Sequence, residues 1–580
     1  MYTNDKNVQI ILGLLKEYGV KKIVASPGTK NVPVVLSVQA DPYFDVYSVV
    51  DERGAAYFAT GLAFESGEPV VIVCTGATAS RNYLPGLTEA YYRKLPVIAL
   101  TCGHQYADSH TLTPQNIDRS VSQNDIKKLT VSLPGIRNNS DYKRSVLLVN
   151  EALTTVLKNG GGPVHIDVLT STLRFSTNKL PEIKKITYLG HEDMLAGGFA
   201  LLSKKLIGKK VGILIGIHKK FSMELTDAID TFADKYDVAV FCDHTSSYHG
   251  KNRVQVSPKL GTNIKEKPDV MIDIGGVSDV FSRVDLVSEA EIWRISEDGA
   301  FIHRNMRGKL AFIFSCSEGF FFKGVSDVYK GKTGNIYFET VYKQNKNKSM
   351  PDLPLSNTFI SSKMSELLPY GASLHIGILN SLRNMNMFEL DDSIDSSCNT
   401  GGFGIDGAVS TIVGQSVVNN NRLYFGMIGD LAFFYDMNSL GIRHRGKNIR
   451  LLVINNNLGV EFRLNPNLEP YFKEKLDPFT TARGHFGSAK GWAESMGFHY
   501  MSAMTKEEFL SLVEEFCDAD INHFDKPVLF EVFTVVEDEQ QGLKMFVDKN
   551  LCSEKKFVNI FKTVKKVVKQ IDKFKGIVEK

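Results

Sequence analysis

Short runs of apolar residues alternate along the chain with longer stretches in which apolar positions recur every three or four residues. The first pattern predicts buried β-strands, and the second predicts amphipathic helices. Up to about residue 172, the predicted strands are VKKIVAS (20–26), DVYSVVDE (45–52), PVVIVCTG (69–76), LPVIALTCG (95–103) and GPVHIDVLT (162–170). Apolar strands separated by helices usually pair in parallel, so we expect one sheet with helices on both faces.

The same alternation continues in two further blocks. The second has predicted strands at VGILIGIH (211–218), VAVFCDH (238–244), DVMIDIGG (269–276), EIWRIS (291–296) and AFIFSCS (311–317). The third has them at ASLHIGILNS (372–381), LYFGMIGD (423–430), IRLLVINNN (449–457) and PVLFEVFTV (527–535). Polar, lysine-rich segments separate the blocks. We therefore predict the α/β class, with three open, mostly parallel sheets in domains at residues 1–178, 186–345 and 355–540. Ligands of such sheets bind at the carboxyl ends of the strands.

The last segment, residues 541–580, has a different pattern. Its apolar residues recur at alternating spacings of three and four among many lysines: Phe557, Ile560, Val564, Val567, Ile571, Phe574 and Val578. This predicts a basic amphipathic helical tail. Packing on its own protein or on a sister subunit is the favoured interpretation. Contact with an anionic membrane surface or with a partner is the alternative.

Composition narrows the class of protein. The chain has 580 residues, 43% of them hydrophobic, and a formal net charge of only +3. Because no concentrated basic face occurs before residue 540, we expect no nucleic-acid partner. The seven cysteines are scattered singly, and we find neither a signal peptide nor roughly 18 consecutive apolar residues. A cytoplasmic globular protein is therefore expected.

The first candidate site combines two strand ends. Gly429 and Asp430 end one apolar strand, and Asn455, Asn456 and Asn457 end another about 25 residues later. If these strands are neighbours, a carboxylate and an amide oxygen meet, and such hard ligands suit Mg²⁺ completed by phosphate oxygens. Gly429 would let a diphosphate approach the backbone. The alternative is an ordinary strand turn followed by an Asn-rich turn.

The second candidate is Glu52, in VVDERGAAYFATG (49–61), where a strand ends in an acid and a helix begins at Gly54. The common interpretation of such a residue is a surface charge or a helix N-terminal acid. The functional one is catalytic. In enzymes that use thiamine diphosphate (ThDP), a glutamate of the protein shares a proton with N1′ of the cofactor's aminopyrimidine. This promotes deprotonation of C2 of the thiazolium.

The third candidate is a glycine-rich stretch, CNTGGFGIDGAVST (398–411), which precedes a predicted helix. Alone it could be the loop of a Rossmann dinucleotide site. In such a site, an acid at the end of the next strand would bind a ribose. That acid would lie too close to Asp430 for Asp430 also to bind a metal, so the two interpretations exclude each other. Ile405 in this loop could be the apolar wedge that bends ThDP.

Several stretches together resemble one enzyme family. They are SPGTKNVP (26–33), DERGAAYFATGLA (51–63), CTGATASRNYLPGLTEAYYRKLPVIALT (74–101), TPQNID (113–118), GPVHIDV (162–168), GFGIDGAVSTIVG (402–414), GDLAFFYDMNSL (429–440) and VINNN (453–457). The chain from about Asn7 to Asp538 resembles the 2-succinyl-5-enolpyruvyl-6-hydroxy-3-cyclohexene-1-carboxylate synthases of menaquinone biosynthesis, which are ThDP enzymes. The resemblance is densest in the first and third domains.

The resemblance implies a pyrimidine-binding domain at 1–178, a central domain at 186–345 and a diphosphate-binding domain at 355–540. It assigns Glu52 as the cofactor-activating acid, and Asp430, Asn456 and the backbone carbonyl of Leu458 as metal ligands. The implied cofactor-binding residues are Pro27, Thr75, Asn82, Ser381, Gly404, Ile405, Gly429, Asp430, Leu431 and Asn456. Each active site would lie between two subunits of a homodimer or homotetramer.

The departures from the family gather where its members bind isochorismate and 2-oxoglutarate, both multiply anionic. Thr29 and Lys30 stand for Ser-Arg, and Thr400 and Met385 stand for arginines. A lysine keeps the charge but loses bidentate geometry. The implied substrate residues are Thr29, Lys30, His104, Gln115, Arg383, Glu461, Phe462 and Arg463.

Glu461 stands where an apolar residue is expected, and Arg463 is its expected partner. A buried carboxylate that faces an anionic substrate is unfavourable unless it is paired. We therefore expect a carboligase that decarboxylates a 2-oxo acid and transfers the acyl carbanion equivalent to a less anionic acceptor, with sugars and sugar nucleotides as candidates.

Other functions stay open. They are the menaquinone-pathway reaction itself, simple decarboxylation, a non-catalytic ThDP-fold binding subunit and a Rossmann oxidoreductase. The joint presence of Glu52, Asp430 and Asn456 argues against the non-catalytic subunit. His165 lies within a predicted strand and is expected to be a hydrogen-bonded core residue, whereas His104 follows a strand end and could reach the site.

Overall fold

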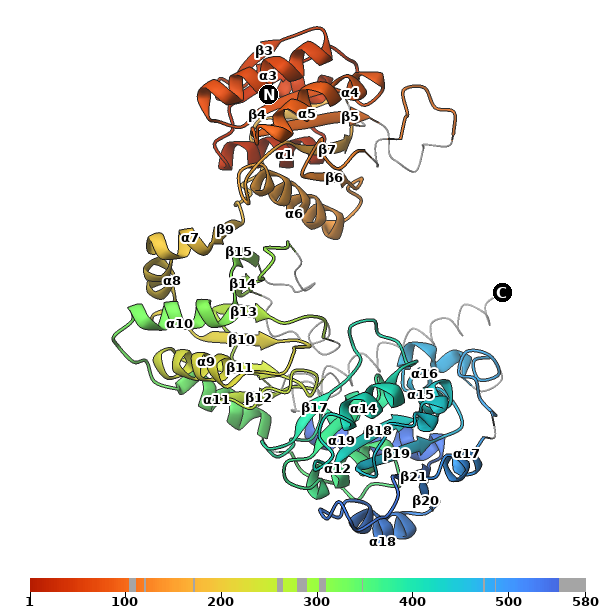
Figure 1. The fold of residues 1–580 in the computed structure, drawn as a ribbon. Coiled ribbons are helices and arrows are strands. Elements are labelled where there is room, and N and C mark those ends of the chain that lie inside the picture. The colour runs from red at the N-terminus through yellow and green to blue at the C-terminus, as the bar shows by residue number, and fades with distance from the viewer. Residues whose placement is uncertain are drawn as a thin grey trace, which may run out of the picture. The chain divides into compact units, whose positions relative to one another are not determined.

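The computed structural model describes residues 1–103, 111–118, 122–170, 173–257, 264–278, 289–301, 309–346, 348–472, 475–485 and 487–551. The chain forms two compact units, Met1–Tyr188 and Leu189–Lys580. Together they hold three sheets built mainly from parallel strands, each with helices on both faces (Figure 1). The predicted α/β class is confirmed. Among the described residues, no helix has the length and apolar character needed to cross a bilayer.

The first unit contains a six-stranded parallel sheet of order β3-β2-β4-β5-β7-β6. One face packs on α1, α2 and α6, and the other on α3 and α5. A short antiparallel pair, β1 with β8, lies outside this sheet. The elements are β1 (Tyr2–Thr3), α1 (Lys6–Glu17), β2 (Lys22–Ala25), α2 (Val32–Gln39), β3 (Asp45–Ser48), α3 (Glu52–Ser66), β4 (Val70–Thr75), α4 (Thr78–Asn82), α5 (Leu84–Tyr92), β5 (Val97–Gly103), β6 (Leu129–Leu133), α6 (Asn139–Thr155), β7 (Val164–Leu169) and β8 (Phe175–Thr177).

The second sheet has the order β12-β11-β10-β13-β14-β15-β9. Helices α8, α9 and α10 cover one face, and α11 packs on the other. Its elements are β9 (Thr187–Gly190), α7 (His191–Asp193), the π-helical η2 (Met194–Gly198), α8 (Phe199–Leu206), β10 (Val211–Ile215), α9 (Met223–Lys235), β11 (Val238–Cys242), β12 (Arg253–Gln255), β13 (Val270–Ile274), β14 (Glu291–Ile295), β15 (Lys309–Ser315), α10 (Glu318–Val328) and α11 (Ile336–Lys346).

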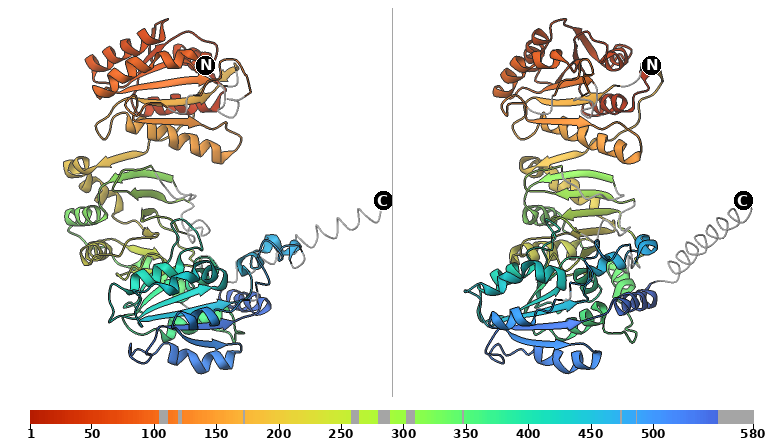
Figure 2. Two further views of the ribbon diagram at one scale, coloured as in Figure 1. Left: turned by 45° about the vertical axis from the view of Figure 1, so that its right-hand side comes forward. Right: turned by 90° about the vertical axis from the view of Figure 1, so that its right-hand side faces the viewer.

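The third sheet has the order β17-β16-β18-β19-β21-β20, with all neighbours parallel. Helices α12, α13, α18 and α19 pack on one face, and α14, α15 and α17 on the other. Figure 2 shows this layering from two further sides. The elements are α12 (Asn357–Leu367), β16 (Ser373–Ile376), α13 (Asn380–Met385), β17 (Asp395–Ser397), α14 (Ala408–Ser416), β18 (Tyr424–Gly429), α15 (Asp430–Asp436), η3 (Met437–Gly441), β19 (Ile449–Asn455), α16 (Val460–Arg463), η4 (Pro466–Tyr471), α17 (Lys490–Ser495), β20 (His499–Ala503), α18 (Lys506–Phe516), β21 (Val528–Phe533) and α19 (Val536–Asn550).

Among the boundaries that differ from the sequence prediction, two concern features singled out in the sequence. Helix α3 begins at Glu52 rather than at Gly54, because the Asp51 side chain caps it by accepting a hydrogen bond from the Arg53 amide. Helix α19 runs across position 540, where the tail was predicted to begin, and it buries Leu543 and Phe546 in the core of the third sheet. The apolar tail positions from Phe557 onward lie outside the described residues.

Candidate cofactor and active site

The two strand ends singled out in the sequence lie side by side. Strands β18 and β19 are parallel neighbours, with Gly429 opposite Ile454. Asp430 follows β18 directly, and its side chain is buried. Its Oδ1 accepts a hydrogen bond from the amide of Leu431 (2.8 Å), and its Oδ2 accepts one from the amide of Asn457 (2.7 Å). The turn after β19 therefore holds the carboxylate that ends β18.

His485 is a further partner of Asp430. Its Nδ1 accepts a hydrogen bond from the Gly487 amide (3.1 Å), so its Nε2 carries the proton that is donated to Asp430 Oδ2 (3.0 Å). Burial raises the pKa of Asp430 despite these hydrogen bonds. No sequence pattern pointed to His485, because it lies in a loop 55 residues after its partner.

Asn456 is the asparagine of this turn whose side-chain oxygen is available to a ligand. The residue is 7% exposed, and its Oδ1 is buried with no hydrogen-bond partner among the described residues. A buried amide oxygen without a partner is unfavourable unless a ligand satisfies it. Asn455 differs, because its side chain is bound to Glu531 and to the Gly487 carbonyl.

The Leu458 carbonyl completes the predicted donor set. It accepts one hydrogen bond, from the Val460 amide (2.9 Å), and a carbonyl oxygen can accept a second contact. Within the described ranges, no three His, Cys, Asp or Glu side chains gather as an all-protein metal cage. One carboxylate, one amide oxygen and one carbonyl nevertheless fit a hard cation that takes its remaining ligands from phosphate and water.

The glycine-rich loop and α13 lie in the same domain of the second unit. Ile405 is partly buried and packs against the apolar cores on both faces of the third sheet. Ser381 is buried in α13, whereas Gly404 is exposed. A Cβ added to Gly429 would meet no atom within 4 Å, so the backbone beside Asp430 is open to a ligand.

The remaining predicted cofactor residues lie in the first unit. Glu52 is partly buried at the start of α3. Thr75 ends β4, and its Oγ1 is buried without a hydrogen-bond partner in the described structure. A Cβ on Gly28 would lie 2.1 Å from that oxygen, so only glycine allows this approach. Pro27 and Asn82 are exposed.

Arg383 and Glu461 form an ion pair between α13 and α16, through Nη1 and Oε1. Their side chains are 3% and 22% exposed. The expected partner of Glu461 was Arg463, and this was wrong. Arg463 instead binds Asp477 through Nε (2.9 Å) and Nη2 (2.6 Å). Residues two apart on a helix do not face each other, which explains the difference.

The other predicted substrate residues are more exposed. Thr29 and Gln115 are exposed, Lys30 is partly buried and Phe462 is 41% exposed. Gln115 has a positive φ of 62°. His104 lies outside the described residues.

His165 is a hydrogen-bonded core residue, as predicted. It is 6% exposed in β7. Its Nε2 lies 2.8 Å from Thr101 Oγ1, and its Nδ1 lies 3.2 Å from Lys127 Nζ. Burial lowers the pKa of Lys127. These contacts account for His165 without a catalytic role.

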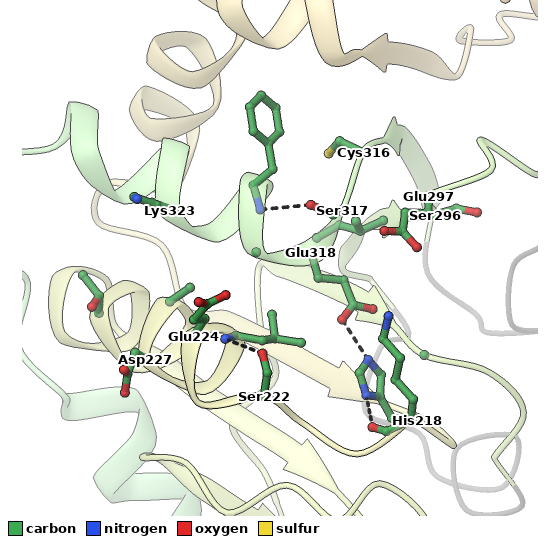
Figure 3. A pocket seen from close by; sticks show the side chains of 18 of the residues that line it. His218, Ser222, Glu224, Asp227, Ser296, Glu297, Cys316, Ser317, Glu318 and Lys323 are labelled. Atoms are coloured by element: carbon green, nitrogen blue, oxygen red, sulfur yellow. Dashed lines mark hydrogen bonds and ion pairs between the residues drawn. The ribbon is translucent and has the colours of Figure 1, made fainter.

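A separate cavity of about 1340 Å³ lies at the carboxyl end of the second sheet (Figure 3). Within it, His218 Nε2 lies 2.8 Å from Glu318 Oε2, and Nδ1 lies 2.6 Å from the Lys219 carbonyl. Both partners offer acceptor oxygens, and the hydrogen bond and charge of Glu318 raise the pKa of His218 although burial alone would lower it. Basic and acidic side chains both line the cavity, including Arg294, Lys323, Glu224 and Asp327.

Known proteins resemble the whole chain. Residues 6–126 match the family model described as "Thiamine pyrophosphate enzyme, N-terminal TPP binding domain". Curated relatives named 2-succinyl-5-enolpyruvyl-6-hydroxy-3-cyclohexene-1-carboxylate synthase are found in Bacteroides fragilis (31% identical, covering 94% of this chain and 99% of the relative) and Phocaeicola vulgatus (28%, covering 94% and 98%). Another, in Flavobacterium johnsoniae, is 27% identical and covers 94% and 99%.

The resemblance found in the sequence is confirmed, as is thiamine diphosphate as the cofactor. The similarity covers 94% of the chain and therefore extends over both units. With 31% identity over nearly the full length of both proteins, the chain belongs to the 2-succinyl-5-enolpyruvyl-6-hydroxy-3-cyclohexene-1-carboxylate synthase family of ThDP enzymes.

Proposed function

We propose that this enzyme uses ThDP and Mg²⁺ to decarboxylate a 2-oxo acid and to transfer the acyl carbanion equivalent to an acceptor. The observation that supports the metal is the buried Oδ1 of Asn456, which has no hydrogen-bond partner among the described residues and belongs to the turn that binds Asp430. ThDP, when bound, supplies the electron sink for loss of CO₂. The protein supplies binding, orientation and proton transfer.

In this proposal, Asp430, Asn456 and the Leu458 carbonyl would hold Mg²⁺ together with the cofactor diphosphate. Glu52 would hold and release the proton needed to activate the cofactor. Ile405 would be the apolar residue that lies against the cofactor. The other proposed cofactor contacts are Pro27, Thr75, Asn82, Ser381, Gly404, Gly429 and Leu431.

We further propose that the acceptor is less anionic than isochorismate. The Arg383–Glu461 ion pair supports this, because the carboxylate neutralises a cation that would otherwise be available to an acidic substrate. Thr29, Lys30, His104, Gln115, Phe462 and Arg463 are the other proposed substrate residues. A sugar or sugar nucleotide is the acceptor class to test first. The reaction named for the relatives, with 2-oxoglutarate and isochorismate, is the competing function.

The decisive experiment is CO₂ release from 2-oxoglutarate and from pyruvate, with ThDP and Mg²⁺ present. Glu52→Gln and Asp430→Asn should each lower the rate at least a hundredfold while the fold is retained by circular dichroism. If both variants keep the wild-type rate, the proposed catalytic machinery is wrong.

Adding isochorismate distinguishes the two acceptor hypotheses. Turnover that is independent of isochorismate and stimulated by an aldose or a keto sugar supports the altered acceptor. Turnover of 2-oxoglutarate that requires isochorismate establishes the reaction named for the relatives and refutes our acceptor argument.

We also propose a homodimer or homotetramer in the cytoplasm, without a nucleic-acid partner. The exposed apolar residues near Glu52 support assembly: Val50 (73% exposed), Tyr57 (48%), Phe58 (42%) and Phe64 (61%). The six described cysteines are all buried and none of them forms a disulfide, which suits a reducing compartment. Membrane contact of the tail is a less favoured proposal.

A further inference from the structure

We propose that Glu531 is a positioning residue that fixes the cation-binding turn after β19; this inference rests on the proposed use of Mg²⁺. Glu531 lies in β21, the parallel neighbour of β19, and is fully buried. Within the described structure it forms no hydrogen bond with Asp430 or Asn456, so it would act through other residues.

The carboxylate of Glu531 is held by four neutral donors. Its Oε1 accepts from Asn455 Nδ2 (2.8 Å), and its Oε2 accepts from Ser488 Oγ (2.6 Å) and Tyr500 Oη (2.7 Å). The Ala489 amide lies 3.1 Å from both oxygens. In the part of the chain that the structure describes, it has no basic ion-pair partner. Hydrogen bonds to a carboxylate are stronger than those between neutral groups, so this cluster holds the Glu531 side chain in one position.

The first route from Glu531 to the metal site runs through Asn455. A carboxylate only accepts hydrogen bonds, so Asn455 must turn its Nδ2 toward Glu531 and its Oδ1 the other way. That Oδ1 accepts from the Asn457 amide (3.2 Å), which also donates to Asp430 Oδ2 (2.7 Å). Glu531, together with the Gly487 carbonyl that also accepts from Nδ2, thus determines that the oxygen end of the Asn455 amide faces the turn.

The turn needs this support because its backbone is unusual. Asn457 has a φ of 61°, in the left-handed region that few side chains other than asparagine tolerate. Asn456, whose oxygen is the proposed ligand, lies between Asn455 and Asn457. Holding the residues on both sides fixes the direction of the Asn456 side chain before any cation binds. Such preorganisation raises metal affinity.

The second route runs through residues 487–489. Ser488 and Ala489 bind Glu531 directly. The preceding Gly487 donates its amide to His485 Nδ1, and His485 donates to Asp430. Both routes end on the same carboxylate oxygen of Asp430. Loss of Glu531 should therefore loosen the proposed amide ligand and the proposed carboxylate ligand together.

The test is the affinity for Mg²⁺, measured by calorimetric titration of full-length protein at saturating ThDP. Glu531→Ala should raise the Mg²⁺ dissociation constant at least tenfold, in line with the effect of removing other outer-shell partners of metal ligands. Glu531→Gln should stay within about threefold, because its carbonyl can accept from Asn455 while its NH₂ donates to the hydroxyls of Ser488 and Tyr500. Turnover of the alanine variant should recover at high Mg²⁺.

Two further variants keep the inference testable if Glu531→Ala does not fold. Asn455→Ala removes the first route alone and should still weaken Mg²⁺ binding about fivefold or more. Tyr500→Phe is the matched control, because it removes one hydrogen bond from Glu531 but leaves both routes intact. It should lower stability and leave the Mg²⁺ dissociation constant within about twofold.

The outcomes separate this inference from the proposed function. If folded Asn455→Ala or Glu531→Ala binds Mg²⁺ as tightly as the wild type, the positioning role is wrong while the metal site stands. If wild-type protein with ThDP binds no Mg²⁺, the proposed function and this inference both fall. If Tyr500→Phe weakens Mg²⁺ binding as much as Asn455→Ala, the effect is general destabilisation and the inference is again overturned.

Discussion

The ion pair with Glu461 limits what Arg383 can do. Arg383 is almost fully buried, and a guanidinium in that position must find an acceptor. In a synthase pocket built for acidic substrates, the substrate itself can be that acceptor. Here Glu461 takes that role, so the proposed substrate pocket would have the charge of Arg383 neutralised before a substrate binds.

Glu461→Gln tests this argument. The variant should lower the free energy of unfolding by about 1–3 kcal/mol, because the buried Arg383 loses an anionic partner. It should also raise turnover with acidic acceptors relative to neutral ones, measured as the ratio of the two kcat/KM values. Glu469→Gln, at an exposed position of the nearby η4, is the control and should change neither quantity. An unchanged acceptor ratio in Glu461→Gln would remove the support for a rebuilt pocket.

Glu539 makes a second prediction at the residue scale. Burial raises its pKa to about 7, although it accepts hydrogen bonds from Thr534 Oγ1 (2.8 Å) and from the Asn357 amide. The native state therefore binds this proton more tightly than the unfolded chain does. The stability of the cofactor-free protein should fall as pH rises from about 4.5 to about 7.

Urea unfolding at pH 5 and pH 7.5 measures this effect. Glu539→Gln should reduce the loss of stability between the two pH values, because it is neutral at both. Glu537→Gln, at an exposed position of the same helix turn, should keep the wild-type pH dependence. Equal pH dependence in wild type and Glu539→Gln would contradict the assignment.

At the scale of elements, the sequence predicted the central strands and missed several edge strands. Strands β4, β5, β10, β11, β18 and β19 are buried along their whole length or nearly so, and each is a continuous apolar run. The edge strands β6 (Leu129–Leu133) and β20 (His499–Ala503) alternate buried and exposed residues over only five positions. So short an alternation is hard to distinguish from a loop.

The residues of the candidate site also divide into those that the sequence predicted and those that it missed. Asp430 and the asparagines stood out because they directly follow apolar strands that proved to be neighbours. His485 and Glu531 could not be found this way. His485 lies in a loop. Glu531 is a lone acid within a buried strand, and its partners come from three separate places in the chain. Their roles depend on tertiary contacts that periodicity does not encode.

His218, in the loop after β10, and Glu318, at the start of α10, form a pair that gives a prediction for the second sheet. Burial alone would lower the pKa of His218, but the hydrogen bond and charge of Glu318 raise it above the ordinary value. The contribution of the His218–Glu318 pair to the free energy of unfolding is therefore complete below about pH 6.5. It is lost as the pH rises through the raised pKa of His218.

Thermal unfolding at pH 6 and pH 9 checks this sign. His218→Gln should lose stability mainly at pH 6, so that its difference between the two pH values is smaller than that of the wild type. His523→Gln removes a more exposed histidine that also lies near carboxylates, and serves as the control. A His218→Gln defect that is equal at both pH values would show that the pair contributes no proton-linked stability.

For the molecule as a whole, the division into two units bears on assembly. Glu52 belongs to the unit Met1–Tyr188, and Asp430 belongs to the unit that begins at Leu189. ThDP must contact both residues if each has its proposed role. Large apolar side chains are exposed beside Glu52, in the manner of a surface that another chain covers. Both features are met if each site takes Glu52 from one subunit and Asp430 from its partner.

Mixed oligomers of two inactive variants test that arrangement. In a heterodimer of Glu52→Gln and Asp430→Asn subunits, one site would receive both substitutions, and the other would receive neither and be fully active. Random pairing at equal expression makes half of the dimers heterodimers, so about a quarter of the wild-type rate of CO₂ release should return. Sites built within one subunit would each keep one substitution, and the mixture would stay as inactive as either variant alone. Mixing at unequal ratios gives a second check, because recovered activity should follow the fraction of heterodimers and reach its maximum at equal amounts.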